Sequence, residues 1–159
     1  MTFTWGGLTP GHAAVEEAQP PDHAVTHTST VEVVGYDKQD IGPAAEGYEV
    51  VATLLTERFS GGIEGMGYAD HIRVFRPDGT QIAAGVERVI GSVGGRTGSF
   101  VLTSHAQDDG SNAVRGVWTV VPGSGTGELA GLRGRGEFTA RVQPDGSWRA
   151  EDNFTYWFD

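Results

Sequence analysis

The sequence has no cysteine, one lysine and no long apolar run, and each absence excludes a class of function. Without cysteine there is no disulfide, no thiol nucleophile and no cysteine-ligated zinc. With 21 acidic residues against 11 basic ones, the net charge of -10 repels the phosphate backbone of nucleic acid. No stretch reaches the roughly 18 apolar residues of a membrane helix, and the N-terminus has no secretory pattern. We therefore expect a cytoplasmic protein that binds neither nucleic acid nor membrane.

Helical periodicity is also absent, because no apolar stripe of ten or more residues recurs at helical spacing. Alternation at period two recurs from about residue 26 and predicts eight strands, at 27–37, 48–59, 63–76, 80–92, 96–106, 112–122, 132–142 and 147–158. The stretches "RPDGT" (76–80) and "QPDGS" (143–147) have the Asp-Gly chemistry of hairpin turns. The prediction is an all-β domain over 26–159, a single eight-stranded antiparallel barrel, preceded by an irregular N-terminal arm at 1–25.

The glycine-rich stretch "GVWTVVPGSGTGELAGLRGRG" (116–136) contains a partial match to a phosphate-binding loop. It lacks the Lys-Ser/Thr pair of that loop, and it leads into another predicted strand rather than into a helix whose N-terminus could hold phosphate. Its glycines suit a wide turn and close backbone approach instead. We expect no nucleotide site here.

The last four strands show which side chains face the interior. Even-numbered residues are mainly apolar in 132–142 and 147–158, which places Asp152 among inward aromatic side chains. The same reasoning turns Ser104 inward and His105 outward.

In the middle strands the two faces differ less in hydrophobicity, so the inward face is harder to identify. In 63–76 the apolar set Met66, Tyr68, Ile72 and Val74 is even-numbered, which predicts Tyr68 and Asp70 inside, with His71 and Arg73 outside. In 80–92 the same criterion turns Arg88 inward, although a slip of one residue would exchange it for Glu87. Strand 48–59 is apolar on both faces and gives no orientation.

Polar side chains at inward positions are the candidates for chemistry, because burying an unpaired charge is costly. The predicted catalytic group is Tyr68, Asp70, Arg88 and Asp152, with the arginine stabilising an anion and a carboxyl as general acid or base. The predicted substrate-binding residues are Met66, Phe100, Ser104, Trp118, Phe138, Trp148, Phe154 and Tyr156. Two simpler alternatives remain open: a structural Arg–Asp bridge, and aromatic residues that only fill the core.

Metal and hydrolase sites find little support. His12, His23 and His27 with Glu16 and Glu17 lack the helix that would align them as metal ligands, so we expect neither metal nor cofactor. A triad built on Ser104 with His71 or His105 fails if both histidines face outward, as expected above.

Three stretches, "FSGGIEGMG", "RPDGTQIAAGVERVIGSVGGRTGSFVL" and "VRGVWTVVPGSGTGELAGLRGRGEF", resemble the DUF3224 family of bacterial proteins over about residues 28–158. The resemblance implies a barrel like that of allene oxide cyclase, a calycin-like fold. The family pattern "GSFVLQH" implies a histidine where this chain has Ser104.

An aromatic-lined pocket with few charges suits a cofactor-independent cyclase or isomerase, which folds an apolar, natural-product-type substrate into a reactive conformer. The alternative is a lipocalin-like carrier of a hydrophobic ligand. Because strand 48–59 offers "VVATLL" on both faces, an outward apolar patch is expected, and with it a homo-oligomer, a dimer before a trimer.

Overall fold

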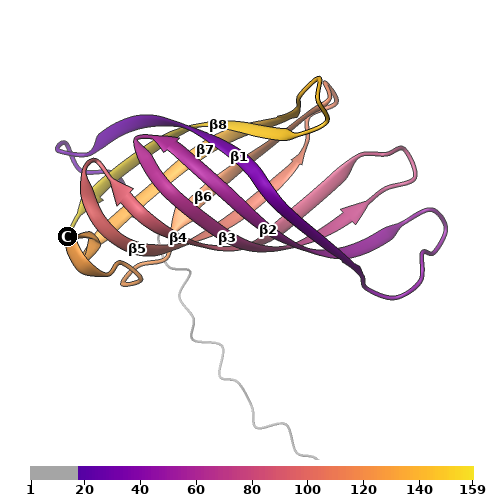
Figure 1. The fold of residues 1–159 in the computed structure, drawn as a ribbon, viewed down its shortest axis with the longest axis horizontal. Helices are drawn as coiled ribbons and strands as arrows, with labels where there is room; N and C mark the ends of the chain where they lie inside the picture. The colour runs from indigo at the N-terminus through magenta and orange to yellow at the C-terminus, as the bar shows by residue number, and fades with distance from the viewer. Residues whose placement is uncertain (1–17) are drawn as a thin grey trace, which may run out of the picture.

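The computed structural model describes residues 18–159 and shows a closed barrel of eight antiparallel strands (Figure 1). In chain order the strands are β1 (Val25–Asp40), β2 (Glu49–Gly61), β3 (Ile63–Phe75), β4 (Gln81–Val93), β5 (Arg96–Asp108), β6 (Ala113–Val120), β7 (Leu132–Val142) and β8 (Trp148–Phe158). One turn of 3-10 helix, η1 (Gly127–Leu129), precedes β7. The predicted all-β barrel is confirmed; residues 1–17 of the predicted arm lie outside the described residues.

Every strand pairs with its neighbours in the sequence, and β1 pairs with β8 to close the ring. β1 carries a bulge between Val33 and Gly35, where its register against β2 shifts. A bulge changes which side chains face inward beyond it. It brings the ring of Tyr36 to the mouth of the barrel interior.

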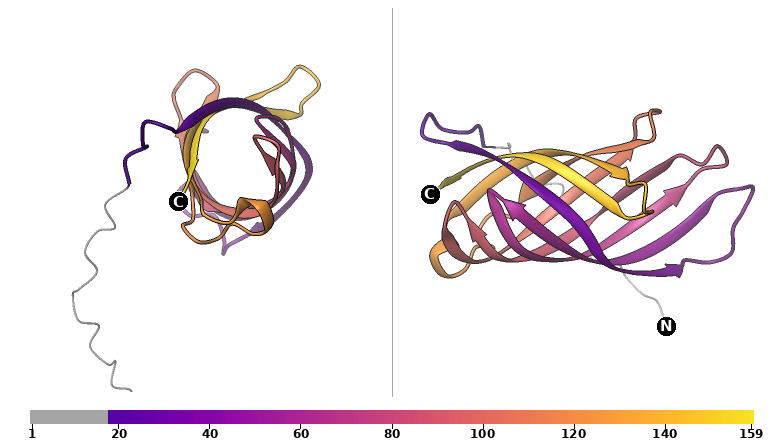
Figure 2. Two further views of the ribbon diagram at one scale, coloured as in Figure 1. Left: turned by 90° about the vertical axis from the view of Figure 1, so that its left-hand side faces the viewer. Right: turned by 45° about the horizontal axis from the view of Figure 1, so that its top comes forward.

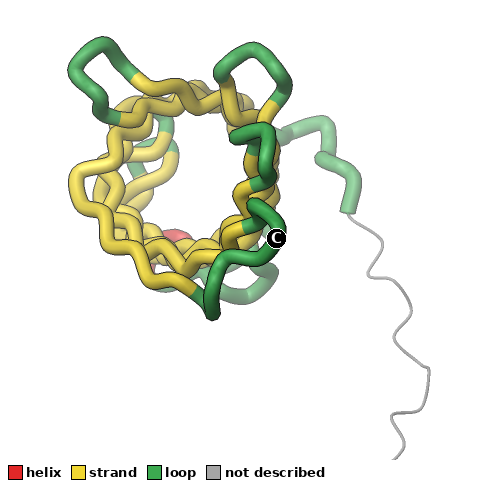
Figure 3. Tube along the Cα trace, turned by 90° about the vertical axis from the view of Figure 1, so that its right-hand side faces the viewer, coloured by secondary structure: helices red, strands yellow, loops and turns green. Residues whose placement is uncertain are grey.

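The two ends of the barrel differ. At one end lie the β1–β2, β3–β4, β5–β6 and β7–β8 loops, which ring the opening in Figure 3; we call it the open end. The other end holds the short β2–β3 and β4–β5 turns and the 121–131 segment with η1, which folds against the rim in Figure 2 (left); we call it the packed end. Leu129 of η1 is completely buried in the hydrophobic core.

The hydrophobic core fills the packed end. It consists of aliphatic and aromatic side chains from all the strands and η1, most of them at most 2% exposed: Val31, Phe59, Ile63, Val89, Val93, Phe100, Leu102, Trp118, Val120, Leu129, Leu132, Phe154 and Tyr156. Burying this apolar surface is the main driving force for folding.

The predicted orientation of the last four strands is confirmed: Ser104, Trp118 and Asp152 are buried. The predicted orientation of β3 and β4 is wrong. Their odd-numbered side chains face inward, with His71 9% and Glu87 1% exposed, whereas Tyr68 is 51% exposed. Several large apolar residues of these two strands, among them Tyr68, Ile72, Val86 and Ile90, lie on the outer face, so choosing the more apolar face reversed both strands.

The glycine-rich segment is a turn, as expected. Gly123, Gly127 and Gly131 have positive φ angles, and the chain continues from η1 directly into β7. Within residues 18–159 no helix is long and apolar enough to cross a membrane.

Candidate ligand-binding cavity

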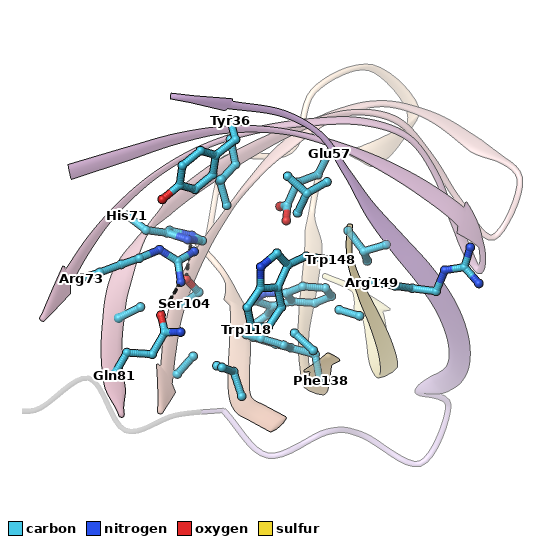
Figure 4. A pocket seen from close by; sticks show the side chains of 18 of the residues that line it. Tyr36, Glu57, His71, Arg73, Gln81, Ser104, Trp118, Phe138, Trp148 and Arg149 are labelled. Atoms are coloured by element: carbon cyan, nitrogen blue, oxygen red, sulfur yellow. Dashed lines mark hydrogen bonds between the residues drawn. The ribbon is translucent and has the colours of Figure 1, made fainter. Parts of the chain in front are cut away.

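A cavity of about 300 Å³ occupies the interior of the barrel towards the open end. It lies above the packed core, at a level where small, polar and aromatic side chains line the interior. Its size is at the lower end of the range for small-molecule sites, about 300–1,000 Å³. Figure 4 shows the side chains that line it.

One wall of the cavity is aromatic. Trp118 of β6 and Phe138 of β7 stack with ring centroids 4.7 Å apart and planes inclined by 27°, and Trp148 of β8 lies beside them (Figure 4). Gly116 makes this stack possible, because a Cβ at that position would lie 2.3 Å from Cζ of Phe138. The wall offers a flat apolar surface of the kind that binds ring systems.

The opposite wall is polar and begins with a histidine and a serine. Nε2 of His71 on β3 and Oγ of Ser104 on β5 are hydrogen-bonded at 3.1 Å. Burial, followed by the charge of Arg73, lowers the pKa of His71 to about 4, so the imidazole is neutral at neutral pH. Gly85 on β4 leaves room for this ring, since a Cβ there would lie 2.4 Å from Cδ2 of His71.

Arg73 continues the polar wall, two residues along β3 from His71. Its Nε donates to Oγ1 of Thr53 at 3.0 Å and its Nη1 donates to Oε1 of Gln81 at 2.8 Å. Both acceptors are neutral, and among residues 18–159 Arg73 forms no ion pair. Two neutral side chains therefore hold the guanidinium in place, and no carboxylate of the described residues forms an ion pair with it.

Two glutamates meet at the floor of the cavity. Glu57 of β2 lines the cavity, whereas Glu87 of β4 lies deeper, with both carboxyl oxygens buried and its carboxyl group against that of Glu57. Gly67 of β3 pairs with Glu57, and a Cβ at Gly67 would collide with Oε1 of Glu87. The missing side chain at Gly67 thus creates the space in which the Glu87 carboxyl sits.

Burial shifts the pKa of both carboxyl groups. Burial raises the pKa of Glu87 well above its usual value, and the charge of Glu57 raises it further. Burial also raises the pKa of Glu57, while the interaction with Glu87 and the charge of Arg73 act in the opposite direction. Two neighbouring buried carboxylates cannot both ionise cheaply. A proton held by the pair relieves this repulsion.

Asp152 lies apart from these groups, on β8. Its Oδ1 accepts a hydrogen bond of 2.7 Å from the backbone N–H of Ser29, and its Oδ2 is buried without a partner among the described residues. Burial raises the pKa of Asp152 to about 6, partly offset by hydrogen bonds from Ser29. It does not line the cavity.

The structure distributes the predicted site residues over four places, of which the separate position of Asp152 is described above. Tyr68, Asp70 and Arg88 come together, but in a shallow hollow on the outer face. Met66, paired with Ile90, is also on that face. Phe100, Phe154 and Tyr156 are buried in the packed core. Four of the predicted substrate-binding residues line the cavity: Ser104, Trp118, Phe138 and Trp148.

Sequence reasoning missed Glu57, His71, Arg73 and Gln81, and kept Glu87 only as the alternative to Arg88. Inward glycines on β3 and β4 are the signal that could have found them, because a glycine opposite a bulky polar residue marks close packing inside a barrel. The signal needs the pairing of the strands, which a single sequence does not supply. His71 and Ser104, which the sequence analysis rejected as a catalytic pair, are in contact in the structure. No third group that would complete a triad is found among residues 18–159.

No group of three or more histidine, aspartate or glutamate side chains in the described part of the chain is arranged to hold a metal ion. His27, part of the rejected metal set, packs edge-on against Tyr156 with ring centroids 5.3 Å apart.

Comparison with known proteins gives a family and a structural neighbour. The family model described as "Protein of unknown function (DUF3224)" matches residues 27–154. A crystal structure of a DUF3224 protein of unknown function from Shewanella oneidensis MR-1 is 26% identical in sequence, with a TM-score of 0.59. The similarity covers 86% of this chain and 97% of that one. No curated protein matches the chain.

Proposed function

Since the chain belongs to the DUF3224 family, whose function is unknown, we propose from its own cavity that it binds a small, largely apolar molecule inside the barrel. The observation that carries this proposal is the cavity of about 300 Å³ with an aromatic wall facing a polar one. Sites for small molecules combine an apolar lining with a few placed polar groups in this way.

The test is binding of N-phenyl-1-naphthylamine, a neutral probe whose fluorescence rises in apolar surroundings. Ala83→Phe narrows the cavity from β4 and should abolish the signal. Ala84→Phe is the matched control, because the neighbouring alanine lies in a hollow of the outer face and the variant should bind the probe like the wild type. Equal binding by both variants, or no binding by the wild type, would contradict the proposal.

A second candidate function is acid–base catalysis without a cofactor, an isomerase or cyclase as the sequence suggested, and one observation favours it. Glu57 exposes a carboxyl group to the cavity, and burial raises its pKa towards neutral pH. A carboxylate with a raised pKa is a better general base for removing a proton next to a carbonyl group. Glu57 takes the proton, the electron pair of the C–H bond forms the C=C bond of an enolate, and the π pair of the carbonyl group moves to its oxygen. The proton then returns from Glu57 at another position as the carbonyl group re-forms.

2-Tetralone in D₂O tests this chemistry, because catalysed enolisation replaces its hydrogens next to the carbonyl by deuterium. We expect Glu57→Gln to slow the exchange by about 10²-fold or more, with N-phenyl-1-naphthylamine binding unchanged. Asp37→Asn, a change of an exposed acid outside the cavity, serves as control. If wild-type exchange equals the uncatalysed rate while the naphthylamine binds, the carrier alternative holds instead.

The outer face of β2, β3 and β4 supports a proposal about assembly. Leu54, Tyr68, Ile72, Val86 and Ile90 are all at least 44% exposed and lie on neighbouring strands. Asp70 and Arg88 lie among them, so two copies related by a two-fold axis would match acid to base across an apolar patch. We propose a homodimer through this face, with a monomer mass in light scattering as the contradicting result and Val86→Glu as the variant that should dissociate it.

A further inference from the structure

The cavity contains a cation, Arg73, that forms no ion pair among residues 18–159 and is attracted by Glu57 only at longer range. Arg73 is one of the residues lining the cavity, and Figure 4 shows its guanidinium between His71 and Gln81. A guanidinium has five N–H donors. One donates to Thr53 and one to Gln81, which leaves three without a hydrogen-bond partner among residues 18–159.

The other arginines of the cavity region are used differently. Arg149, which also borders the cavity, points away from it in Figure 4 and forms an ion pair of 2.7 Å with Glu32. Arg58, which does not line the cavity, reaches the same glutamate at 3.7 Å. Among the described residues, Arg73 is thus the cation whose charged group faces the inside of the cavity.

The neighbours of Arg73 fix its direction without satisfying its charge. Thr53 is itself held, because its Oγ1 donates to the backbone oxygen of His71 at 3.2 Å. Gln81 is held by its backbone N–H, which donates to Oδ2 of Asp108. A planar cation fixed at two of its nitrogens loses little conformational entropy when it binds a carboxylate, which is the planar anion that it matches best.

Glu57 is the acidic residue that lines the cavity, but its carboxyl group does not pair with the guanidinium of Arg73. It forms no ion pair with Arg73, and its carboxyl meets Glu87 over Gly67. Burial lowers the pKa of Arg73 more than its charged neighbours raise it, so the half-buried cation is incompletely compensated and the carboxylate of a ligand would stabilise it.

We propose that the ligand is an aromatic or similarly flat carboxylic acid, bound with its carboxylate on Arg73 and its apolar body against Trp118, Phe138 and Trp148. The inference rests on the proposed function, since it assigns the ligand class of the same cavity. It explains why the polar and aromatic walls face each other: each receives one end of the molecule.

The experiment compares 2-naphthoate with 2-naphthamide, which has nearly the same shape and no charge, by isothermal titration calorimetry. We expect the wild type to bind the acid more tightly than the amide. Arg73→Met should weaken naphthoate binding by about ten-fold or more, the loss expected for a charge-assisted hydrogen bond. It should leave naphthamide binding within about two-fold. Arg88→Met, on the outer face, is the matched control and should bind both probes like the wild type.

Gln81→Glu is a second variant in case Arg73→Met does not fold. It places a carboxylate against Nη1 of Arg73 and so neutralises the cation without removing it. It should weaken naphthoate binding and spare naphthamide binding. If the acid and the amide bind equally, or if neither variant discriminates between them, the carboxylate proposal is wrong while the binding function stands. If neither probe binds the wild type, both proposals fail.

Discussion

The packed end and the open end of the barrel are built from the same eight strands, yet side chains fill the interior at one end and leave a cavity at the other. At the packed end inward positions carry side chains such as Phe100 and Phe154, which are completely buried. At the open end inward positions carry a mixture of small, polar and aromatic side chains, and a cavity remains. Stability and ligand binding are therefore carried by different levels of one sheet, and substitutions at the two levels should have separable effects.

The largest effect is expected at the packed end. Phe154→Ala removes a ring that is 0% exposed and packs on Tyr156, and it should lower the free energy of unfolding by about 3–5 kcal/mol. Urea unfolding followed by tryptophan fluorescence measures the loss. A cost below about 1 kcal/mol would mean that the packed end is not where the stability resides.

A smaller but substantial loss is expected at the boundary between the two levels. Gly67→Ala places a methyl group against the Glu87 carboxyl and 2.8 Å from Cε2 of Phe59, and should cost about 2–3 kcal/mol. Gly35→Ala is the control, because its Cβ would approach only the Thr56 side chain, at 3.1 Å. Equal melting temperatures for the two variants would show that the Glu87 carboxyl does not need this space.

The third prediction concerns pH. Burial raises the pKa of Asp152 from 3.8 to about 6, so its carboxyl is penalised when it ionises in the folded state. The stability it contributes is fully present below about pH 4 and is lost as the pH rises through about 6, by about 2–3 kcal/mol in all. The free energy of unfolding should therefore fall over this window.

Asp152→Asn should flatten that part of the pH profile, since the amide does not titrate. The slope, measured by urea unfolding at several pH values, is the relevant quantity, because the buried amide changes the absolute stability as well. An unchanged slope between about pH 4 and 6 would place the responsible proton elsewhere, on Glu57 or Glu87.

The smallest effect on stability is expected at the open end. Trp148 is only partly buried, so Trp148→Ala should change the free energy of unfolding by about 1 kcal/mol or less. The same variant removes part of the aromatic wall and should weaken N-phenyl-1-naphthylamine binding clearly. If the variant loses stability but keeps its affinity for the probe, the assignment of stability to the packed end and of binding to the open end is wrong.

The fold could be predicted from the sequence because alternation and turn chemistry act locally. In β7 and β8 the inward positions are apolar except for Asp152, and the predicted inward set is correct. In β3 and β4 the rule that apolar side chains face inward fails. Space inside the barrel is limited, so Gly67 and Gly85 face inward to admit Glu87 and His71, while Val86 and Ile90 are left on the outer surface.

The candidate site was predicted in part for the same reason. Trp118, Phe138 and Trp148 lie on strands of clear alternation and do line the cavity. The polar wall comes from β2, β3 and β4, where both faces carry apolar residues and orientation depends on packing between strands. Contacts such as that between His71 and Ser104 join residues 33 positions apart, and no local pattern encodes them.

The pairing of β1 with β8 also sets an order of events during biosynthesis. Val25–Glu32 hydrogen-bonds to residues 149–156, and the Ser29 backbone reaches Asp152 across 123 positions of the chain. On a ribosome that edge of β1 stays uncovered until nearly the whole sequence has emerged, so ring closure is a late, long-range step. The nascent chain is thus most exposed to edge-to-edge aggregation just before synthesis of β8 is complete.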